Sequence, residues 1–234
     1  MTTGGIMAKR NRNQNRPQKV ARLLVVDDHP MVRERLTEVV NSEADLRVCG
    51  EAKDAQEALR VIAATDPDLV LVDLNMGGCA GLDLIKDISV RHPKVLMLVV
   101  SIHDESTYAE RALRAGAHGY ISKQKATTAV LEAIRKVLAG EVYMSQELAA
   151  QIACKVTGHH RQAAMRVDAL SDRELRVFEL IGQGYRMREI AEMLHLDVKT
   201  VETYRSRIEE KLELKDANEV LKQAIRWSRN VAPS

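Results

Sequence analysis

The sequence predicts an α/β domain built on a doubly wound parallel sheet, followed by a smaller all-α domain. The 234 residues suffice for about two domains, since a domain usually contains roughly 100–200 residues. Short apolar runs alternate with helical patterns over residues 21–140, an order typical of a parallel sheet with crossover helices. From Ser171 onward the pattern is helical throughout, so a second core is expected there.

Five apolar runs in the first domain have the length of buried strands. The strands are expected near residues 22–27, 46–50, 68–73, 95–100 and 118–121. Helices are expected between and after them, over 31–41, 55–64, 82–91, 105–115 and 126–139. Pro67, Pro93 and Gly116 fall between these elements, where residues that interrupt regular structure belong. The predicted fold is a (βα)5 domain covering residues 21–140.

The second domain is expected over residues 168–234, after a linker at 141–167 that contains a short helix. Ser171 and Glu174 have the spacing of a capping box, which starts the first of four helices. Asp197 is expected to cap the third. The four helices are expected over 171–182, 187–194, 198–213 and 216–228. Short helices with such tight connections indicate a helix-turn-helix.

Charge and composition limit the class of protein. Residues 1–20 hold five basic residues and no acidic one, and are expected to form a disordered basic tail. No apolar run approaches the ~20 residues of a membrane span, and no apolar signal core follows the start, so an intracellular protein without a membrane partner is predicted. The three cysteines are expected to be reduced and mostly buried; they are Cys49, Cys79 and Cys154.

Polar side chains follow several of the predicted strands. Asp27 and Asp28 follow the first strand, Asp73 the third, Ser101 the fourth and Lys123 the fifth. Because the carboxyl ends of parallel strands meet at one edge of a sheet, these side chains are expected to share a pocket. The simpler interpretation, that the acids cap the following helices, accounts for one acid better than for three.

The pocket is expected to bind Mg²⁺ and to accept a phosphoryl group. A carboxylate attacks phosphorus when a cation neutralises the incoming oxygens, and Mg²⁺ prefers carboxylate oxygens and water. Asp28 and Asp73 would be direct ligands, Asp27 would act through water, and the carbonyl of Asn75 would complete the shell.

Four segments of the first domain resemble the receiver domain of bacterial response regulators. They are Val26–Arg33, Val72–Met76, Val100-Ser101 and Gly119–Lys123. The resemblance implies that Asp73 accepts a phosphoryl group from a sensor histidine kinase, while Asp27 and Asp28 organise Mg²⁺. It also implies that Lys123 pairs with the acyl phosphate.

The resemblance further implies a switch, in which Ser101 hydrogen-bonds a phosphate oxygen and Tyr120 rotates inward behind it. His103, two residues beyond Ser101, is expected to be exposed. The sequence departs from the family where Gly77 stands in place of a proline and Ala80 in place of an Asp or Asn.

The second domain carries a second set of recognisable motifs. Leu170–Leu175, Glu189–Ala191, Lys199–Glu202 and Ile208 with Lys211-Leu212 resemble the LuxR-type helix-turn-helix. Together with the receiver motifs, they give the architecture of the NarL/FixJ family. The net charge of 168–234 is slightly negative, which is unusual for a DNA-binding domain, and Arg186 replaces the small residue that usually caps the second helix.

The third helix of this domain has the pattern of a major-groove helix. At about 100° per residue, Val201, Ile208 and Leu212 share one face and are expected in the core. Base contacts are expected from Glu202, Thr203 and Ser206, and phosphate contacts from Lys199, Thr200, Arg207 and Lys211. Arg205 lies nearer the core and is expected to form a structural ion pair.

The sequence therefore predicts a transcriptional regulator. Phosphorylation of Asp73 is expected to control homodimerisation and binding to a two-fold site on double-stranded DNA. Two alternatives keep the architecture: a DNA-binding regulator that works without phosphorylation, suggested by the loop at Gly77, and a receiver that serves as a protein-interaction module. A phosphohydrolase usually needs a second acid two residues after the nucleophile. Asn75 stands there, so no enzyme is expected beyond self-phosphorylation and dephosphorylation.

Overall fold

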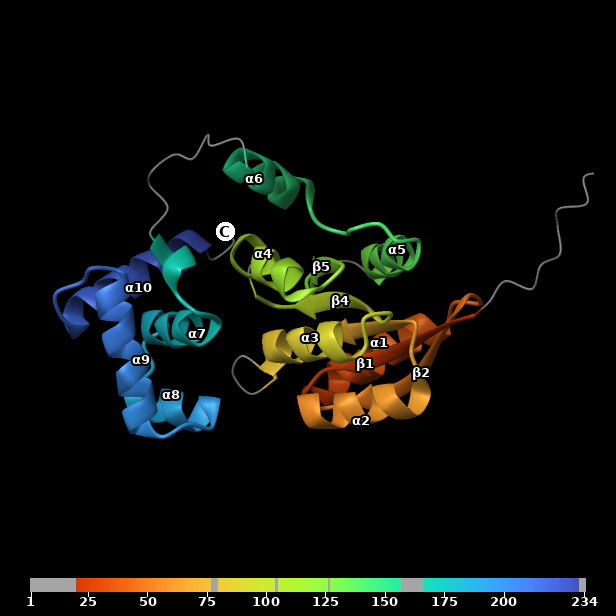
Figure 1. The fold of residues 1–234 in the computed structure, drawn as a ribbon, viewed down its shortest axis with the longest axis horizontal. Helices are drawn as coiled ribbons and strands as arrows, with labels where there is room; N and C mark the ends of the chain where they lie inside the picture. The colour runs from red at the N-terminus through yellow and green to blue at the C-terminus, as the bar shows by residue number, and fades with distance from the viewer. Residues whose placement is uncertain (1–19, 77–79, 104, 126, 157–165, 232–234) are drawn as a thin grey trace, which may run out of the picture.

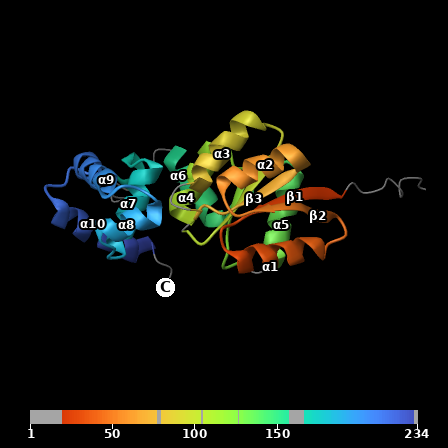
Figure 2. The same ribbon diagram turned by 90° about the horizontal axis from the view of Figure 1, so that it is seen from below.

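The computed structural model describes residues 20–76, 80–103, 105–125, 127–156 and 166–231 (Figure 1). The described chain forms a sheet domain and a helical domain that lie next to each other (Figures 1 and 2). None of the helices in these ranges has the length and apolar character needed to cross a membrane. The predictions about the basic tail, Gly77 and Cys79 concern residues outside these ranges.

The sheet has five parallel strands in the order β2-β1-β3-β4-β5. They are β1 (Ala21–Val26), β2 (Leu46–Ala52), β3 (Leu69–Val72), β4 (Leu96–Ser101) and β5 (Gly119–Ser122). All four residues of β3 are buried, because helices cover both faces of the sheet and leave no face for polar side chains. The doubly wound α/β fold predicted from the sequence is confirmed.

Five helices cover the two faces of the sheet. They are α1 (Pro30–Asn41), α2 (Ala55–Thr65), α3 (Ala80–Arg91), α4 (Glu105–Ala115) and α5 (Thr127–Leu138). Since successive strand residues point to opposite faces, Leu23 and Val25 pack with α1 and α5. Leu24 and Val26 pack with the other three helices.

The helical domain is arranged around α7 (Figure 1), and its buried side chains are continuous with the hydrophobic cluster on one face of the sheet. Its helices are α7 (Asp172–Gly182), α8 (Met187–Leu194), α9 (Val198–Lys211) and α10 (Ala217–Val231). Between the domains lie α6 (Gln146–Val156) and the short 3-10 helix η1 (Arg166–Ala169). Phe178 and Trp227 anchor the core, with ring centroids 5.8 Å apart.

The helix starts in this domain confirm one predicted cap and correct another. Glu174 accepts a hydrogen bond from Ser171 N at 2.7 Å, and Ser171 Oγ accepts one from Glu174 N at 3.4 Å, which makes the predicted capping box. Asp197 occupies the capping position of α9, but its side chain accepts no capping hydrogen bond. Arg186 is not a usual capping residue and makes no side-chain cap, but the Glu189 carboxylate accepts a hydrogen bond from Arg186 N at 2.6 Å and so satisfies the start of α8.

Candidate functional site

Two buried carboxylates lie side by side at the carboxyl edge of the sheet. β1 and β3 are adjacent and parallel, and Val26 pairs with Val72. The residues that follow, Asp27 and Asp73, are therefore brought together, and each is 1% exposed. A hydrogen bond of 2.9 Å from Asp73 N to the Val26 carbonyl fixes the two strand ends.

Lys123 reaches the same pocket from the loop after β5. Its ammonium nitrogen lies 2.7 Å from Asp73 Oδ2 and 2.6 Å from Asp27 Oδ2. Burial by itself lowers the pKa of Lys123, but the carboxylates of Asp73 and Asp27 outweigh burial and hold that pKa above its ordinary value. Lys123 is charged at neutral pH and offsets one of the two buried negative charges.

The pocket offers the oxygen ligands that a hard divalent cation needs. Asp27, Asp28, Asp73 and His29 each provide a ligand atom, and these atoms lie within 4.8 Å of one another. Asp73 Oδ1 is buried and has no hydrogen-bond partner among the described residues, so its lone pairs are left for a ligand that enters the pocket. The three acids fit Mg²⁺, whereas an imidazole suits it less well. His29 Nδ1 contacts the Asp28 carboxylate; His29 was not singled out from the sequence, although it directly follows the acid pair.

Ser101 and Tyr120 lie behind the acids, and both side chains are fully buried. Ser101 Oγ accepts a hydrogen bond from His103 N at 3.2 Å, and the Tyr120 hydroxyl donates to the His103 carbonyl at 2.9 Å. Lys123 N donates to the Ser101 carbonyl at 2.8 Å, which ties the ends of β4 and β5 together. Tyr120 already faces inward in this unphosphorylated structure. The inward rotation predicted for phosphorylation therefore does not separate the two states.

The prediction that His103 is exposed is wrong. Its side chain is 9% exposed and its ring packs against Tyr108, with ring centroids 4.6 Å apart. His103 Nδ1 lies 3.8 Å from Glu179 of the helical domain. Burial lowers the pKa of His103 to about 4, and the nearby Arg176 charge acts in the same direction. The sequence pattern of the sheet domain alone contains no sign of the second domain that covers this residue.

A second candidate site lies on α9. Val201 and Ile208 are fully buried against the rest of the domain, as predicted. The residues predicted to contact DNA bases, Glu202, Thr203 and Ser206, are all exposed. Among the residues predicted to contact phosphates, Lys199, Arg207 and Lys211 are exposed and Thr200 is half-buried. The outward face of α9 is thus free for a ligand in this arrangement.

Two charged side chains of α9 are engaged within the domain. Arg205 forms the predicted ion pair, with its Nε 3.3 Å from Glu209. Lys211 was expected to be free for DNA phosphate, but its Nζ lies 2.6 Å from the buried carboxylate of Glu174. Although burial raises the pKa of Glu174, the Lys211 ammonium and the Ser171 backbone outweigh burial and hold it below its ordinary value. Lys211 therefore also holds the start of α7 against α9.

The two sites correspond to two known families. Residues 23–135 match the family described as "Response regulator receiver domain", and residues 168–224 match "Bacterial regulatory proteins, luxR family". Response regulator GacA of Pseudomonas aeruginosa is 34% identical over 205 residues, which cover 88% of this chain and 95% of that protein. The chain belongs to the NarL/FixJ family of response regulators. The transcriptional activator protein ExaE of Pseudomonas putida is 36% identical over 203 residues, 87% of this chain and 95% of that protein.

Solved response regulators share this fold. A LuxR-family response regulator from Aurantimonas sp. SI85-9A1 is 34% identical with a TM-score of 0.55, over 59% of this chain and 99% of that chain. RcsB from Salmonella enterica serovar Typhimurium, solved bound to promoter rprA with the phosphomimetic BeF3-, is 22% identical with a TM-score of 0.60, over 86% and 96% of the two chains. The second likeness concerns the fold alone. By its family, the protein is a two-component response regulator that regulates transcription under the control of phosphorylation.

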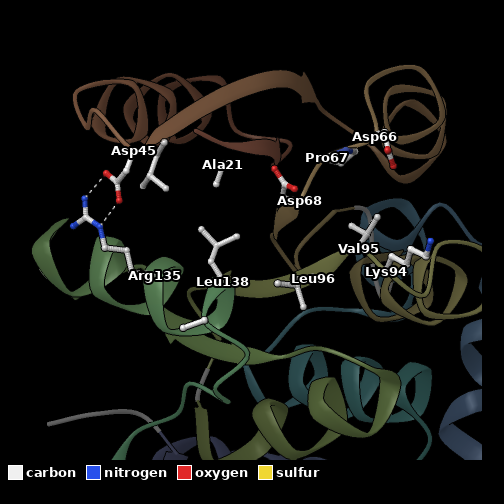
Figure 3. A pocket seen from close by; sticks show the side chains of 12 residues that line it. Ala21, Asp45, Asp66, Pro67, Asp68, Lys94, Val95, Leu96, Arg135 and Leu138 are labelled. Atoms are coloured by element: carbon white, nitrogen blue, oxygen red, sulfur yellow. Dashed lines mark hydrogen bonds and ion pairs between the residues drawn. The ribbon is translucent and has the colours of Figure 1, made fainter. Parts of the chain in front are cut away.

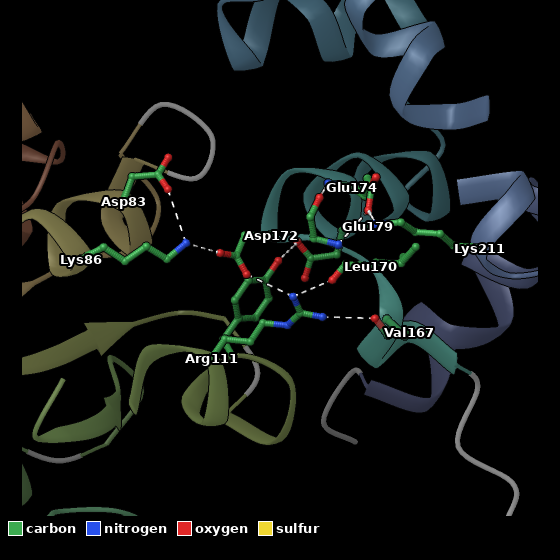
Figure 4. A network of polar contacts seen from close by, with 11 residues as sticks. Asp83, Lys86, Arg111, Val167, Leu170, Asp172, Glu174, Glu179 and Lys211 are labelled. Atoms are coloured by element: carbon green, nitrogen blue, oxygen red, sulfur yellow. Dashed lines mark hydrogen bonds and ion pairs between the residues drawn. The ribbon is translucent and has the colours of Figure 1, made fainter. Parts of the chain in front are cut away.

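The receiver and the LuxR-type domain are joined by polar contacts centred on Arg111 of α4 (Figure 4). The Arg111 guanidinium donates to the carbonyls of Leu170 and Val167 at 2.8 and 3.1 Å, and to Asp172 at 3.0 Å. Lys86 of α3 approaches the same Asp172 at 2.8 Å. Burial raises the pKa of Asp172, but Lys86 and Arg111 outweigh it and hold that pKa below its ordinary value. One acid of the LuxR-type domain is thus shared by two receiver helices.

His103 is expected to report on this docking by its titration. Docked, its pKa is about 4 rather than 6.5, so between these pH values the undocked protein binds more protons than the docked one. Docking should therefore weaken as the pH falls from 6.5 towards 4. The imidazole resonances of His103 in NMR are expected to titrate near 4 in the wild type and closer to 6.5 in an undocked variant. Equal midpoints in the two proteins would contradict burial of His103 by docking.

A cavity of about 710 Å³ lies at the opposite edge of the sheet (Figure 3). It is lined by residues at or near the starts of strands, such as Ala21, Leu46 and Leu96, so it is far along the strands from Asp73. Its main polar contact joins Arg135 to Asp45 at 2.8 and 2.9 Å. That ion pair links α5 to the start of β2 and holds the receiver together rather than forming a second reactive centre.

Proposed function

We propose that Asp73 is the phosphoacceptor, and that its phosphorylation by a sensor histidine kinase controls DNA binding by the LuxR-type domain. One observation carries this proposal. Asp73 is buried with Oδ2 paired to Lys123, while Oδ1 has no hydrogen-bond partner among the described residues. A carboxylate with one oxygen held by a cation and the other free is oriented for attack on phosphorus.

The chemistry follows from these contacts. Asp73 Oδ1 forms a bond to phosphorus while the bond from phosphorus to the kinase histidine nitrogen breaks, and that nitrogen keeps the electron pair. Lys123 stays within reach of the acyl phosphate and compensates its charge. Asp27, Asp28, Asp73 and the Asn75 carbonyl would hold Mg²⁺, which neutralises phosphoryl oxygens when bound. Asn75 provides no acid for hydrolysis of external substrates, so the protein is proposed not to be an enzyme in that sense.

Ser101 and Tyr120 are proposed to transmit the change. Ser101 Oγ accepts a hydrogen bond from His103 N, and the Tyr120 hydroxyl donates one to the carbonyl of the same His103. When Ser101 turns to a phosphate oxygen, its bond to His103 N is lost. Because His103 packs beside Glu179 of α7, this change reaches the LuxR-type domain directly.

DNA binding is proposed to use the outward face of α9. Exposed Glu202, Thr203 and Ser206 would contact base edges, and Lys199, Thr200 and Arg207 would contact phosphates, with Lys211 in a secondary role because of its ion pair. Since the domain has no basic surplus, one copy offers few phosphate contacts. A homodimer on a two-fold DNA site doubles the number of phosphate contacts. The proposed DNA and kinase partners also imply a cytoplasmic location.

Phosphorylation of Asp73 and its effect on DNA binding are tested together. Wild-type protein incubated with Mg²⁺ and acetyl phosphate is expected to gain the mass of one phosphoryl group, and Asp73→Ala is expected to gain none. A DNA fragment is first selected from random sequence by its binding to the phosphorylated wild type. Asp73→Ala, treated in the same way, should bind this fragment at least several-fold more weakly than the phosphorylated wild type does. An adduct that persists in Asp73→Ala would exclude Asp73 as the acceptor, and equal DNA affinity would favour a regulator that works without phosphorylation.

A further inference from the structure

Arg176 of α7 extends from the LuxR-type domain to the loop that carries the proposed phosphoacceptor. Its Nη2 donates to Asn75 Oδ1 at 3.1 Å, and Asn75 stands two residues after Asp73. Its Nη1 donates to Glu179 at 2.8 Å. The Arg176 side chain is 11% exposed, and its Nε is buried without a hydrogen-bond partner among the described residues. A charged group of one domain is thus held at the edge of the reactive pocket of the other.

The loop after Asp73 is already restricted on its other side. A Cβ at Gly81, in the first turn of α3, would lie 2.5 Å from the Asp73 carbonyl and from Leu74 Cα. That turn therefore packs directly on the backbone of residues 73–74. The hydrogen bond from Arg176 restricts the next side chain, Asn75, so residues 73–75 are held between α3 and α7.

A buried network keeps the Arg176 guanidinium in place. Glu179 accepts hydrogen bonds from Arg176 and from the Tyr108 hydroxyl, both at 2.8 Å. His103 lies 3.8 Å from the same carboxylate. Two of these partners, Tyr108 and His103, belong to the receiver, so the position of Arg176 is set jointly by both domains. Arg173, on the same helix, instead meets Asp83 in a more exposed pair at 3.2 Å.

We infer that Arg176 is a positioning residue for the phosphoryl transfer, supplied by the LuxR-type domain and acting through Asn75. While the bond to Asn75 is intact, it restrains residues 73–75 and slows phosphoryl transfer to Asp73, whose side chain is 1% exposed. When the domains separate, the restraint is released. Since binding effects between two sites are reciprocal, a change at Asn75 that follows phosphorylation also weakens the docking. This inference rests on the proposed role of Asp73.

The test measures the rate of labelling by acetyl phosphate in full-length protein with Mg²⁺. Arg176→Met is expected to accelerate labelling about three- to tenfold, and Arg176→Lys, which keeps one donor, should lie between it and the wild type. In an Asn75→Ala background, which removes the acceptor but keeps the backbone carbonyl, Arg176→Met should change the rate less than twofold. Such non-additivity is the mark of a contact between the two side chains.

Arg173→Met is the matched control, because it breaks an interdomain ion pair on the same helix without touching Asn75. Its rate should stay within twofold of the wild type. Equal acceleration by Arg176→Met with and without the Asn75 side chain would overturn the inference, and so would equal effects of Arg176→Met and Arg173→Met. If the wild type takes up no phosphoryl group at all, the proposed role of Asp73 fails together with the inference. If the wild type is labelled but the variants behave as above, the inference about Arg176 fails alone.

Discussion

Replacing Lys123 with methionine is expected to lower the free energy of unfolding of the receiver by about 3–5 kcal/mol at neutral pH. Lys123 Nζ lies within 2.7 Å of both buried acids, Asp27 and Asp73, and no other cation among the described residues is placed so close to the two. Methionine has a similar volume, so the loss comes from charge rather than from a cavity. Removing one member of a buried ion pair leaves uncompensated charge, which is far more destabilising than the pair was stabilising.

Mg²⁺ distinguishes this explanation from a packing defect. Added Mg²⁺ should restore part of the lost stability of Lys123→Met, because the cation replaces the missing positive charge among the acids. Urea unfolding monitored by circular dichroism, with and without Mg²⁺, measures this effect. A loss that is independent of Mg²⁺ would contradict the electrostatic origin.

In the wild type, the contribution of Lys123 depends on pH only in the alkaline range. Its pKa is raised above the ordinary 10.5 in the folded protein, chiefly because the two carboxylates outweigh burial. The stabilisation is therefore fully present below 10.5 and is lost only as the pH rises through the higher folded value. Across the neutral range Lys123 therefore stays charged and its contribution does not change with pH.

The reactive pocket is the part of the structure that the sequence predicts best. Asp27, Asp73, Ser101 and Lys123 each lie at or just after the end of a predicted strand, and parallel strands bring such positions to one edge whatever the details of packing. Helix caps were harder to predict. The spacing identified Ser171 with Glu174 correctly, whereas Asp197 takes the capping position without its side chain making the bond.

The interdomain contacts could not be predicted from local patterns. His103 has the sequence context of a surface loop, and only the approach of Glu179, 76 positions further along the chain, buries it. Lys211 has the position of a phosphate-binding lysine on a helical wheel, but a buried Glu174 on another helix engages it. Both errors concern ionisable residues whose partners lie far away in sequence, where periodicity carries no information.

Replacing Arg111 with alanine is expected to release the LuxR-type domain from the receiver. One guanidinium supplies hydrogen bonds to two carbonyls, Leu170 and Val167, and to the Asp172 carboxylate. Hydrogen bonds to charged groups contribute about 1.5–3 kcal/mol each, and water replaces part of this when the surfaces separate. We therefore expect the docking equilibrium to shift by about 2–3 kcal/mol, roughly 30- to 150-fold. Small-angle X-ray scattering should show a larger radius of gyration.

Arg114→Ala provides the matched control. Arg114 lies on the same helix and pairs with Glu110 within the receiver, so its loss leaves the interdomain contacts intact. Arg114→Ala should keep the scattering profile of the wild type, whereas Arg111→Ala should change it and also raise the His103 pKa towards 6.5. Unchanged scattering and titration in Arg111→Ala would mean that apolar contacts or the Arg176 network hold the domains together. Release of the LuxR-type domain also breaks the hydrogen bond from Arg176 to Asn75. Undocking by Arg111→Ala is therefore expected to accelerate phosphorylation of Asp73, although Arg111 itself touches neither Asp73 nor Asn75.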